Sequence, residues 1–180
     1  PQGSVLSPLL FIFFIADMFT NCSGLDFKFA DDATLLHVNA SLESALHDLR
    51  QDCDQISVWL HMWKIACEPT KTEIVVFGDH VIPPNTDNLR LQGTAIKVTD
   101  SSVALGIRID KHLSFKQHFQ ERTLKTHQHW LAIKNKVHLL NLSTYTVSKI
   151  IQAVIIPGWT YLAYLWADPQ WFRGHKMWYD

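Results

Sequence analysis

Several features that mark secreted proteins and zinc enzymes are scarce or absent in this 180-residue sequence. Its three cysteines are widely spaced along the chain: Cys22, Cys53 and Cys67. An odd, scattered set argues against a disulfide framework and favours a reducing, intracellular compartment in the cytoplasm and nucleus. There is no CxxC pair and no HExxH motif, and His127 and His129 fit exposed helix positions better than a metal site. The apolar run 9–16 is too short to cross a bilayer and lacks a basic leader, so no membrane partner is expected.

Net charge is also small, at −1, but it is unevenly distributed. Residues 1–60 carry eight acids against Lys28 and Arg50, whereas residues 111–150 carry one acid, Glu121, against seven bases. Those bases are Lys111, Lys116, Arg122, Lys125, Lys134, Lys136 and Lys149. The asymmetry suits a metal-binding half beside a phosphate-contacting half, and a solvated helix face is the alternative. An apolar fraction of 47% is enough for a buried core, in one domain or in one domain with a small appendage.

Two adjacent carboxylates, Asp31 and Asp32, lie between two apolar runs. Residues 25–29 alternate with period two and residues 34–38 are mostly apolar, which predicts a hairpin with acid at its tip. Hard oxygen ligands so close together suit Mg²⁺ or Mn²⁺. Such an ion would offset the repulsion between the two charges. A solvated turn is the alternative, because Asp is common in turns.

Several motifs accompany this box in a fixed order. The chain begins Pro1-Gln2-Gly3-Ser4-Val5-Leu6-Ser7-Pro8-Leu9-Leu10-Phe11, and the box itself reads Phe29-Ala30-Asp31-Asp32. Later come Trp63-Lys64-Ile65, Pro69-Thr70-Lys71-Thr72 and Leu105-Gly106-Ile107-Arg108-Ile109-Asp110, and then an apolar segment at 150–166. Together these motifs resemble reverse transcriptases of non-LTR retrotransposons over residues 1–168. The ordered set is more specific than any one motif.

The resemblance implies an RNA-directed DNA polymerase that uses two Mg²⁺ (or Mn²⁺) ions, an RNA template, a DNA primer and deoxynucleoside triphosphates. It implies metal ligation by Asp31, the stronger ligand, and by Asp32, and proton transfer to the leaving group assisted by Lys71. The residues implied to contact nucleotide or template are Gln2, Gly3, Ser4, Phe29 and Ala30. The residues implied to support the primer are Leu105 and Gly106. The candidates for phosphate contacts in the basic half are Lys116, Arg122, Lys125, Lys134 and Lys136.

The resemblance is incomplete in ways that bear on activity. The family's third carboxylate, on a strand before the glycine-rich motif, and its fingers are absent from this chain, which begins at Pro1 within a motif. We therefore interpret the chain as a fragment that is inactive alone. Relatives usually carry Asn at the positions of Ile12 and Ala16, Tyr at Phe29 and Asn at Glu68. A non-catalytic remnant that binds nucleic acid or protein is the alternative function.

The best-defined helix follows the hairpin. Apolar residues recur at three- and four-residue steps from Leu42 to Trp63, with Ser41 as the expected cap. Its outer face is expected to carry Glu43, Asp48, Arg50, Asp52 and Asp54. An earlier helix should begin at Ser7 or Pro8 and stop before Gly24. Because it is apolar nearly all round, it should be buried on most sides.

The remaining chain predicts short strands and then helices. A strand is expected at 74–77, a hairpin joins 89–91 to 96–98, and 103–109 is one further strand. A loop with Pro83 and Pro84 lies between the first two. Helices are expected from 115 to at least 137, from 144 to 156 ending at Pro157-Gly158, and at 159–166.

We therefore predict an α+β fold. A partial palm at 1–112, a small antiparallel sheet with the acidic hairpin at its centre and helices on one face, precedes a helical thumb at 113–168 and a tail at 169–180. Without the missing strand and fingers, the sheet should expose an edge and one helix of buried type. Poor solubility or dependence on a partner is the expected consequence.

Overall fold

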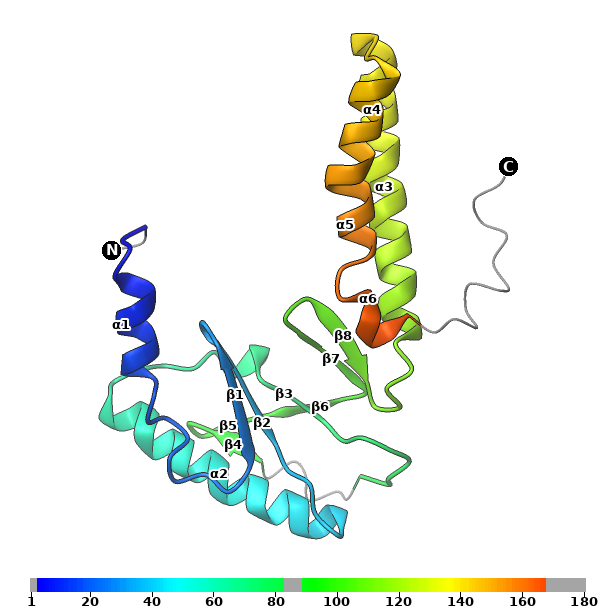
Figure 1. The fold of residues 1–180 in the computed structure, drawn as a ribbon. Helices are drawn as coiled ribbons and strands as arrows, with labels where there is room; N and C mark the ends of the chain where they lie inside the picture. The colour runs from blue at the N-terminus through cyan, green and yellow to red at the C-terminus, as the bar shows by residue number, and fades with distance from the viewer. Residues whose placement is uncertain (1–2, 83–88, 168–180) are drawn as a thin grey trace. The chain divides into compact units, whose positions relative to one another are not determined.

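The structure, a computed structural model, describes residues 3–82 and 89–167 (Figure 1). The chain divides into two compact units, Pro1–Leu105 and Gly106–Asp180. This division falls before residue 112, where the sequence predicts the end of the palm. Gln2, the Pro83-Pro84 loop and the tail at 169–180 lie outside the described residues. Within those residues, no helix is both long enough and apolar enough to cross a membrane.

Helix α2 (Leu42–Met62) is the framework of the first unit, as the sequence predicts. Ser41 caps it, because the Ser41 hydroxyl accepts a hydrogen bond from the Ser44 backbone N–H at 3.1 Å. The side chains that it buries are those of Asp52, Cys53, Ile56, Trp59 and Leu60. The apolar ones form the core with three side chains from other elements: Phe19, Leu91 and Ile96.

Helix α1 (Ser7–Phe14) starts where the sequence predicts, with Pro8 in its first turn. It ends ten residues before Gly24, however, and turns continue the chain to residue 21. The prediction that it is buried is wrong. None of its residues is buried, and Leu10 and Phe13 are 65% and 77% exposed. The reason is missing cover: among the described residues, ring contacts reach only Phe14, from Trp59 and Trp63. This outcome matches our other expectation, that a helix of buried type is left exposed.

Strands β1 (Leu25–Phe29) and β2 (Asp32–Leu36) form the predicted hairpin, in the register Phe29 to Asp32 and Leu25 to Leu36. The predicted sheet around it is wrong. Among the described residues, β1 and β2 pair only with each other, so the hairpin is not the centre of a larger sheet. The physical reason is that the later strands find partners among themselves.

The short helix η1 (Pro69–Lys71) precedes the first of these later strands. The strands are β3 (Glu73–Val75), β4 (Arg90–Leu91), β5 (Thr94–Ala95) and β6 (Lys97–Thr99). Strands β4 and β5 pair antiparallel, and the chain reverses between them at Gln92 and Gly93, which both have positive φ. Strand β6 then pairs with β3, and the pairing is parallel. The sheets are therefore not all antiparallel as predicted.

The predicted strand at 103–109 is interrupted. Strand β7 (Ser101–Ala104) ends the first unit and β8 (Ile107–Asp110) begins the second. Between them, Leu105 and Gly106 have φ of 49° and 80°. A strand cannot run through two residues in the left-handed region, so the chain turns there.

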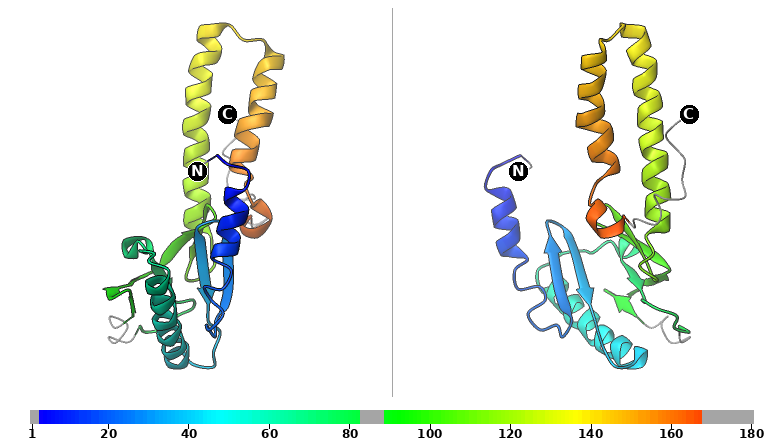
Figure 2. Two further views of the ribbon diagram at one scale, coloured as in Figure 1. Left: turned by 90° about the vertical axis from the view of Figure 1, so that its left-hand side faces the viewer. Right: turned by 45° about the vertical axis from the view of Figure 1, so that its right-hand side comes forward.

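The second unit is mainly helical. Helix α3 (Lys116–Leu140) lies beside a second helical run that consists of α4 (Thr144–Ile150), η3 (Ile151–Ile155) and α5 (Ile156–Trp159) (Figure 2). The second run was predicted to end before Pro157, but it widens into a π-helix at η3 and continues to Trp159. Helix α6 (Ala163–Trp166) is shorter than predicted. Its Trp166 is 3% exposed and packs on His118 and Phe119.

Helices and small sheets together are compatible with the α+β class.

Candidate functional site

The two carboxylates of the box lie at the tip of the hairpin. Asp31 is in the two-residue turn with Ala30, and Asp32 is the first residue of β2. Ala30 adopts φ of 53°, a left-handed conformation that reverses the chain within two residues. Both aspartates are exposed, and neither carboxylate makes a hydrogen bond or ion pair with another described residue. The tip therefore presents two adjacent, unpaired carboxylates to solvent.

This donor set fits a hard divalent cation in part. Carboxylate oxygens are the ligands that Mg²⁺ prefers, and Mg²⁺ usually keeps several waters, so two protein carboxylates are a sensible share of its coordination sphere. No cluster of three or more His, Cys, Asp or Glu side chains that could hold a metal occurs among the described residues. The tip thus offers ligands for a metal without forming a complete protein cage.

One face of the hairpin is held and the other is bare. On the held face, the Lys28 ammonium donates to the Ala16 carbonyl at 3.1 Å and lies 5.1 Å from the centre of the Phe19 ring. It also pairs with Asp26 at 3.2 Å. The alternating apolar side chains of β1 point the other way and are more than half exposed: Leu25, Phe27 and Phe29. Phe29, a predicted nucleotide contact, belongs to this bare face.

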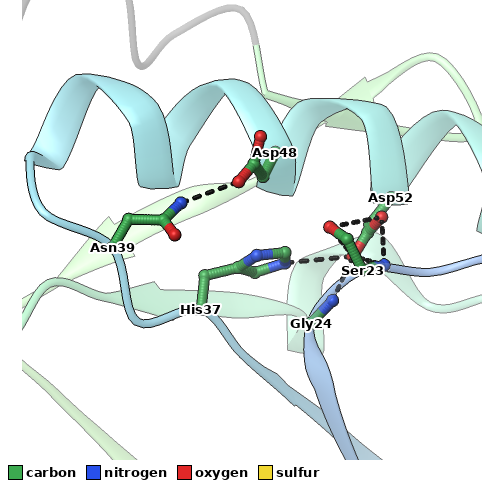
Figure 3. Close-up of polar contacts among 6 residues, drawn as sticks. All are labelled: Ser23, Gly24, His37, Asn39, Asp48 and Asp52. Atoms are coloured by element: carbon green, nitrogen blue, oxygen red, sulfur yellow. Dashed lines mark hydrogen bonds and ion pairs between the residues drawn. The ribbon is translucent and has the colours of Figure 1, made fainter.

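The open end of the hairpin is anchored on α2 by Asp52 (Figure 3). The Ser23 N–H donates to both carboxylate oxygens, at 2.9 and 3.0 Å, and the Gly24 N–H donates to Oδ2 at 3.0 Å. His37 Nε2 lies 3.1 Å from the same Oδ2, at ion-pair distance but without the geometry of a hydrogen bond. Asp52 is 2% exposed, so its predicted place on the outer face of the helix is wrong.

Sequence reasoning missed this cluster although a signal was present. Position 52 lies three residues after Leu49 and four before Ile56, which places it in the apolar stripe of α2. An acidic residue in such a stripe must find donors inside the protein. The neighbouring Asp48 is partly exposed and accepts a hydrogen bond from the Asn39 amide at 2.7 Å.

The other predicted residues of the first unit lie on different elements. Gly3, with φ of 91°, and Ser4 precede α1, which lies next to the hairpin in Figures 1 and 2. Lys71 is exposed at the end of η1, just before β3. Glu68, which replaces the family's Asn, accepts a hydrogen bond from the Thr70 hydroxyl at 2.6 Å, and this bond lowers the pKa of Glu68 below its usual value.

In the second unit, Arg122 is hydrogen-bonded to backbone carbonyls. Its guanidinium donates to the carbonyl of Gly106 at 2.9 Å and to that of Gly158 at 3.4 Å, and it lies 5.0 Å from the centre of the Tyr161 ring. Arg122 therefore links the residue after Leu105 to the end of the second helical run. The phosphate contact that the sequence predicts for Arg122 stays a prediction.

The lysines predicted with Arg122 do lie open on α3. All are exposed, and none of their ammonium groups makes a hydrogen bond or ion pair within the part of the chain that the structure describes: Lys116, Lys125, Lys134 and Lys136. Such side chains are available to phosphate. The two exposed histidines on this helix, His127 and His129, belong to no metal cluster of the described chain.

Comparisons with known proteins agree with the motif order. The family model described as reverse transcriptase (RNA-dependent DNA polymerase) matches residues 1–128. A probable RNA-directed DNA polymerase from transposon BS of Drosophila melanogaster is 28% identical over 178 residues, which cover 92% of this chain and 19% of that protein. The RNA-directed DNA polymerase from mobile element jockey of Drosophila funebris is 27% identical over 175 residues, covering 89% and 18%. A probable RNA-directed DNA polymerase from transposon X-element of Drosophila melanogaster is 25% identical, covering 92% and 19%.

The chain thus spans about a fifth of the length of these relatives. No solved structure matches it.

Proposed function

Because the chain belongs to the reverse transcriptase family, we propose that it is part of an RNA-directed DNA polymerase of a non-LTR retrotransposon. In this proposal residues 1–112 contribute to the palm and residues 113–168 form the thumb. The parent enzyme extends a DNA primer on an RNA template: the primer's 3′-hydroxyl attacks the α-phosphate of a deoxynucleoside triphosphate, and pyrophosphate leaves.

The observation that carries the proposal is the exposed pair Asp31 and Asp32 at the hairpin tip, within the segment that the family model matches. These carboxylates would hold Mg²⁺ or Mn²⁺, with Asp31 the stronger ligand. When bound, two such ions lower the pKa of the attacking hydroxyl and neutralise charge on the leaving group. Phe29 and Ala30 would face the nucleotide, and Gln2, Gly3 and Ser4 would approach the nucleotide and template.

The same geometry limits what the chain does alone. Two metal ions about 3.5 to 4 Å apart need more ligands than two neighbouring carboxylates provide. The described residues bring no third carboxylate to the tip. We therefore expect the purified 180-residue chain to bind a divalent ion weakly at this tip and not to extend a primer, with the missing ligand supplied by the parent protein's remaining palm and fingers.

Metal binding tests the proposal without requiring catalysis. The wild-type chain is titrated with Mn²⁺, and paramagnetic broadening of backbone amide signals reports where the ion binds. We expect broadening centred on residues 29–32, and we expect Asp31→Ala to abolish it. Asp26→Asn is the matched control, because Asp26 lies on the same hairpin but already pairs with Lys28. Broadening that is unchanged in Asp31→Ala would refute a metal site at the tip.

A primer-extension assay on an RNA template tests the limit on activity. Extension by the wild-type chain above the level of Asp31→Ala would contradict the inactivity proposed for the chain alone, while leaving the metal site intact. In the longer parent protein, the same substitution is expected to abolish extension.

A second function is favoured by the exposed lysines of α3. A non-catalytic chain could still bind nucleic acid through Lys116, Lys125, Lys134 and Lys136, because phosphate contacts require only accessible cations. Binding of a primer–template duplex measured at two salt concentrations tests this role. Affinity must fall as salt rises, and salt-independent binding would exclude it.

A further inference from the structure

The acidic pair can act on a metal only if the hairpin that carries it is held in place, and the hairpin's main polar anchor is at its opposite end. We propose that Asp52 is a positioning residue: its buried carboxylate fixes the open end of the hairpin on α2 and thereby sets where Asp31 and Asp32 lie. This inference rests on the metal-binding role proposed for the tip.

Asp52 holds both strands at once (Figure 3). Toward β1, it accepts the N–H groups of Ser23 and Gly24, the two residues immediately before the strand, and lies 3.4 Å from the Ser23 hydroxyl. Toward β2, it pairs with His37, the first residue after the strand ends at Leu36. One side chain on α2 therefore contacts the start of one strand and the end of the other.

The fit at this end leaves little room for movement. A Cβ on Gly24 would lie 2.7 Å from His37 Nε2 and still closer to a methyl group of Leu35. The backbone before β1 is thus packed against the side chain of Leu35 in β2 and against that of His37 just after β2. The side chain of His37 is 8% exposed and that of Asp52 is 3% exposed, so water cannot easily replace either partner.

The other restraints lie on one face of the hairpin. On that face Lys28 contacts Ala16 and Phe19, and Leu35 of β2 packs against the core, whereas the apolar side chains of β1 on the other face are uncovered. A two-stranded hairpin is marginally stable by itself in water. A hairpin released at its base therefore frays, and Asp31 and Asp32 lose the fixed spacing that the paired strands give them.

The chemistry of the anchor makes it sensitive to a single atom. Every group that faces the Asp52 carboxylate from Ser23 and Gly24 is a donor. In Asp52→Asn, an amide oxygen at the place of Oδ2 can still accept both N–H groups, because each lies 3.0 Å from that atom. The amide NH₂ then takes the place of Oδ1 and faces the Ser23 N–H, donor against donor, and the charge that strengthens these hydrogen bonds is lost, although the side chain keeps its size.

The test compares Mn²⁺ binding by the wild-type 180-residue chain, Asp52→Asn and Asp48→Asn at a temperature where each is fully folded. Asp48 is the matched control, because it lies one turn earlier on α2 and bonds Asn39, outside the anchor. We expect Asp52→Asn to bind Mn²⁺ at the tip severalfold more weakly, because the neutral amide holds the base of the hairpin less tightly than the carboxylate does. Faster hydrogen exchange of the β1 and β2 amides should accompany it. Asp48→Asn should leave both readouts unchanged.

A merely structural role gives a different result. If Asp52→Asn lowers the melting temperature but its folded fraction binds Mn²⁺ with wild-type affinity, the positioning role is wrong. If Asp52→Asn does not fold, His37→Gln, which removes only the contact to β2, decides: weaker Mn²⁺ binding supports the inference and unchanged binding overturns it. Failure of the metal site itself is recognised separately, because Asp31→Ala would then leave Mn²⁺ binding unchanged.

Discussion

Asp110 should be a strong single determinant of stability in the second unit. It ends β8, and its carboxylate organises the loop that leads into α3. Oδ1 accepts the N–H groups of His112 and Ser114, both at 3.1 Å. Oδ2 accepts the Phe115 N–H at 2.7 Å and the Ser114 hydroxyl at 3.1 Å. The loop needs such support, because Leu113 and Phe115 have φ of 54° and 53°, a conformation that is unfavourable for residues other than glycine.

The size of the effect follows from these contacts. The donors from Ser114 and Phe115 are partly buried, whereas the His112 N–H is exposed and can bond water instead. With about 1 kcal/mol for each of the three bonds from partly buried donors, Asp110→Ala should lower the free energy of unfolding by about 3 kcal/mol. Asp110→Asn keeps one acceptor oxygen and should lose roughly half as much. For a chain of this size, the larger loss lowers the melting temperature by roughly 6 to 12 °C.

The effect should also depend on pH. Partial burial alone raises the pKa of Asp110, but the hydrogen bonds from Ser114, Phe115 and His112 outweigh it, so the pKa is held below the usual value of 3.8. A carboxyl whose pKa is lower in the folded state contributes stability above its unfolded pKa and loses it as pH falls through the folded pKa. The stability difference between wild type and Asp110→Asn should therefore be constant near neutral pH and shrink below about pH 4.

Urea unfolding followed by tryptophan fluorescence measures these differences, with Trp130, Trp159 and Trp166 as probes within the second unit. Asp54→Ala is the control, because Asp54 is an exposed aspartate on α2. If Asp110→Ala unfolds within about 0.5 kcal/mol of wild type, as ordinary surface substitutions do, the carboxylate does not organise the loop.

Two further substitutions test the packing of each unit. Gly24→Ala should destabilise the first unit by about 1 to 3 kcal/mol in a urea titration, because the added Cβ has no space beside Leu35 and His37. Wild-type stability of this variant would show that the residues around Gly24 can shift freely. Arg122→Gln should lower the unfolding midpoint and leave the salt dependence of duplex binding unchanged, since Arg122 is bound to carbonyls. Lys125→Gln should leave the unfolding midpoint unchanged and reduce the slope of log affinity against log salt by about 0.9. A reduced slope in Arg122→Gln would show that Arg122 contacts phosphate.

Local signals in the sequence predicted the elements whose causes are local. The period-two pattern around Asp31 and Asp32 gave the hairpin, and the apolar spacing from Leu42 together with the Ser41 cap gave α2 almost to the residue. The motif order predicted the family. Each of these signals lies within a short stretch of chain, so no tertiary information was needed.

The features that the sequence did not predict depend on tertiary partners. The apolar composition of α1 predicts burial, but burial needs a second surface, and the described residues provide almost none. Asp52 was predicted on the exposed face of α2 because it is acidic. The residues that surround it, Ser23, Gly24 and His37, lie 15 to 29 residues away in the sequence. Likewise, β6 fitted a hairpin by sequence but pairs with β3 instead, because register across a loop is not encoded locally.

An uncovered apolar face also explains why the hairpin tip is weakly supported. Leu25, Phe27 and Phe29 alternate as a buried strand face does, yet they are exposed beside the acidic pair, as are most apolar side chains of α1. Covering one such side chain stabilises a protein by about 1.5 to 3 kcal/mol, so a surface placed over β1 would add a second restraint to the hairpin. Among the described residues that restraint is absent, and the hairpin that carries Asp31 and Asp32 is held by the anchor at Asp52, by Lys28 and by the packing of Leu35 on the core.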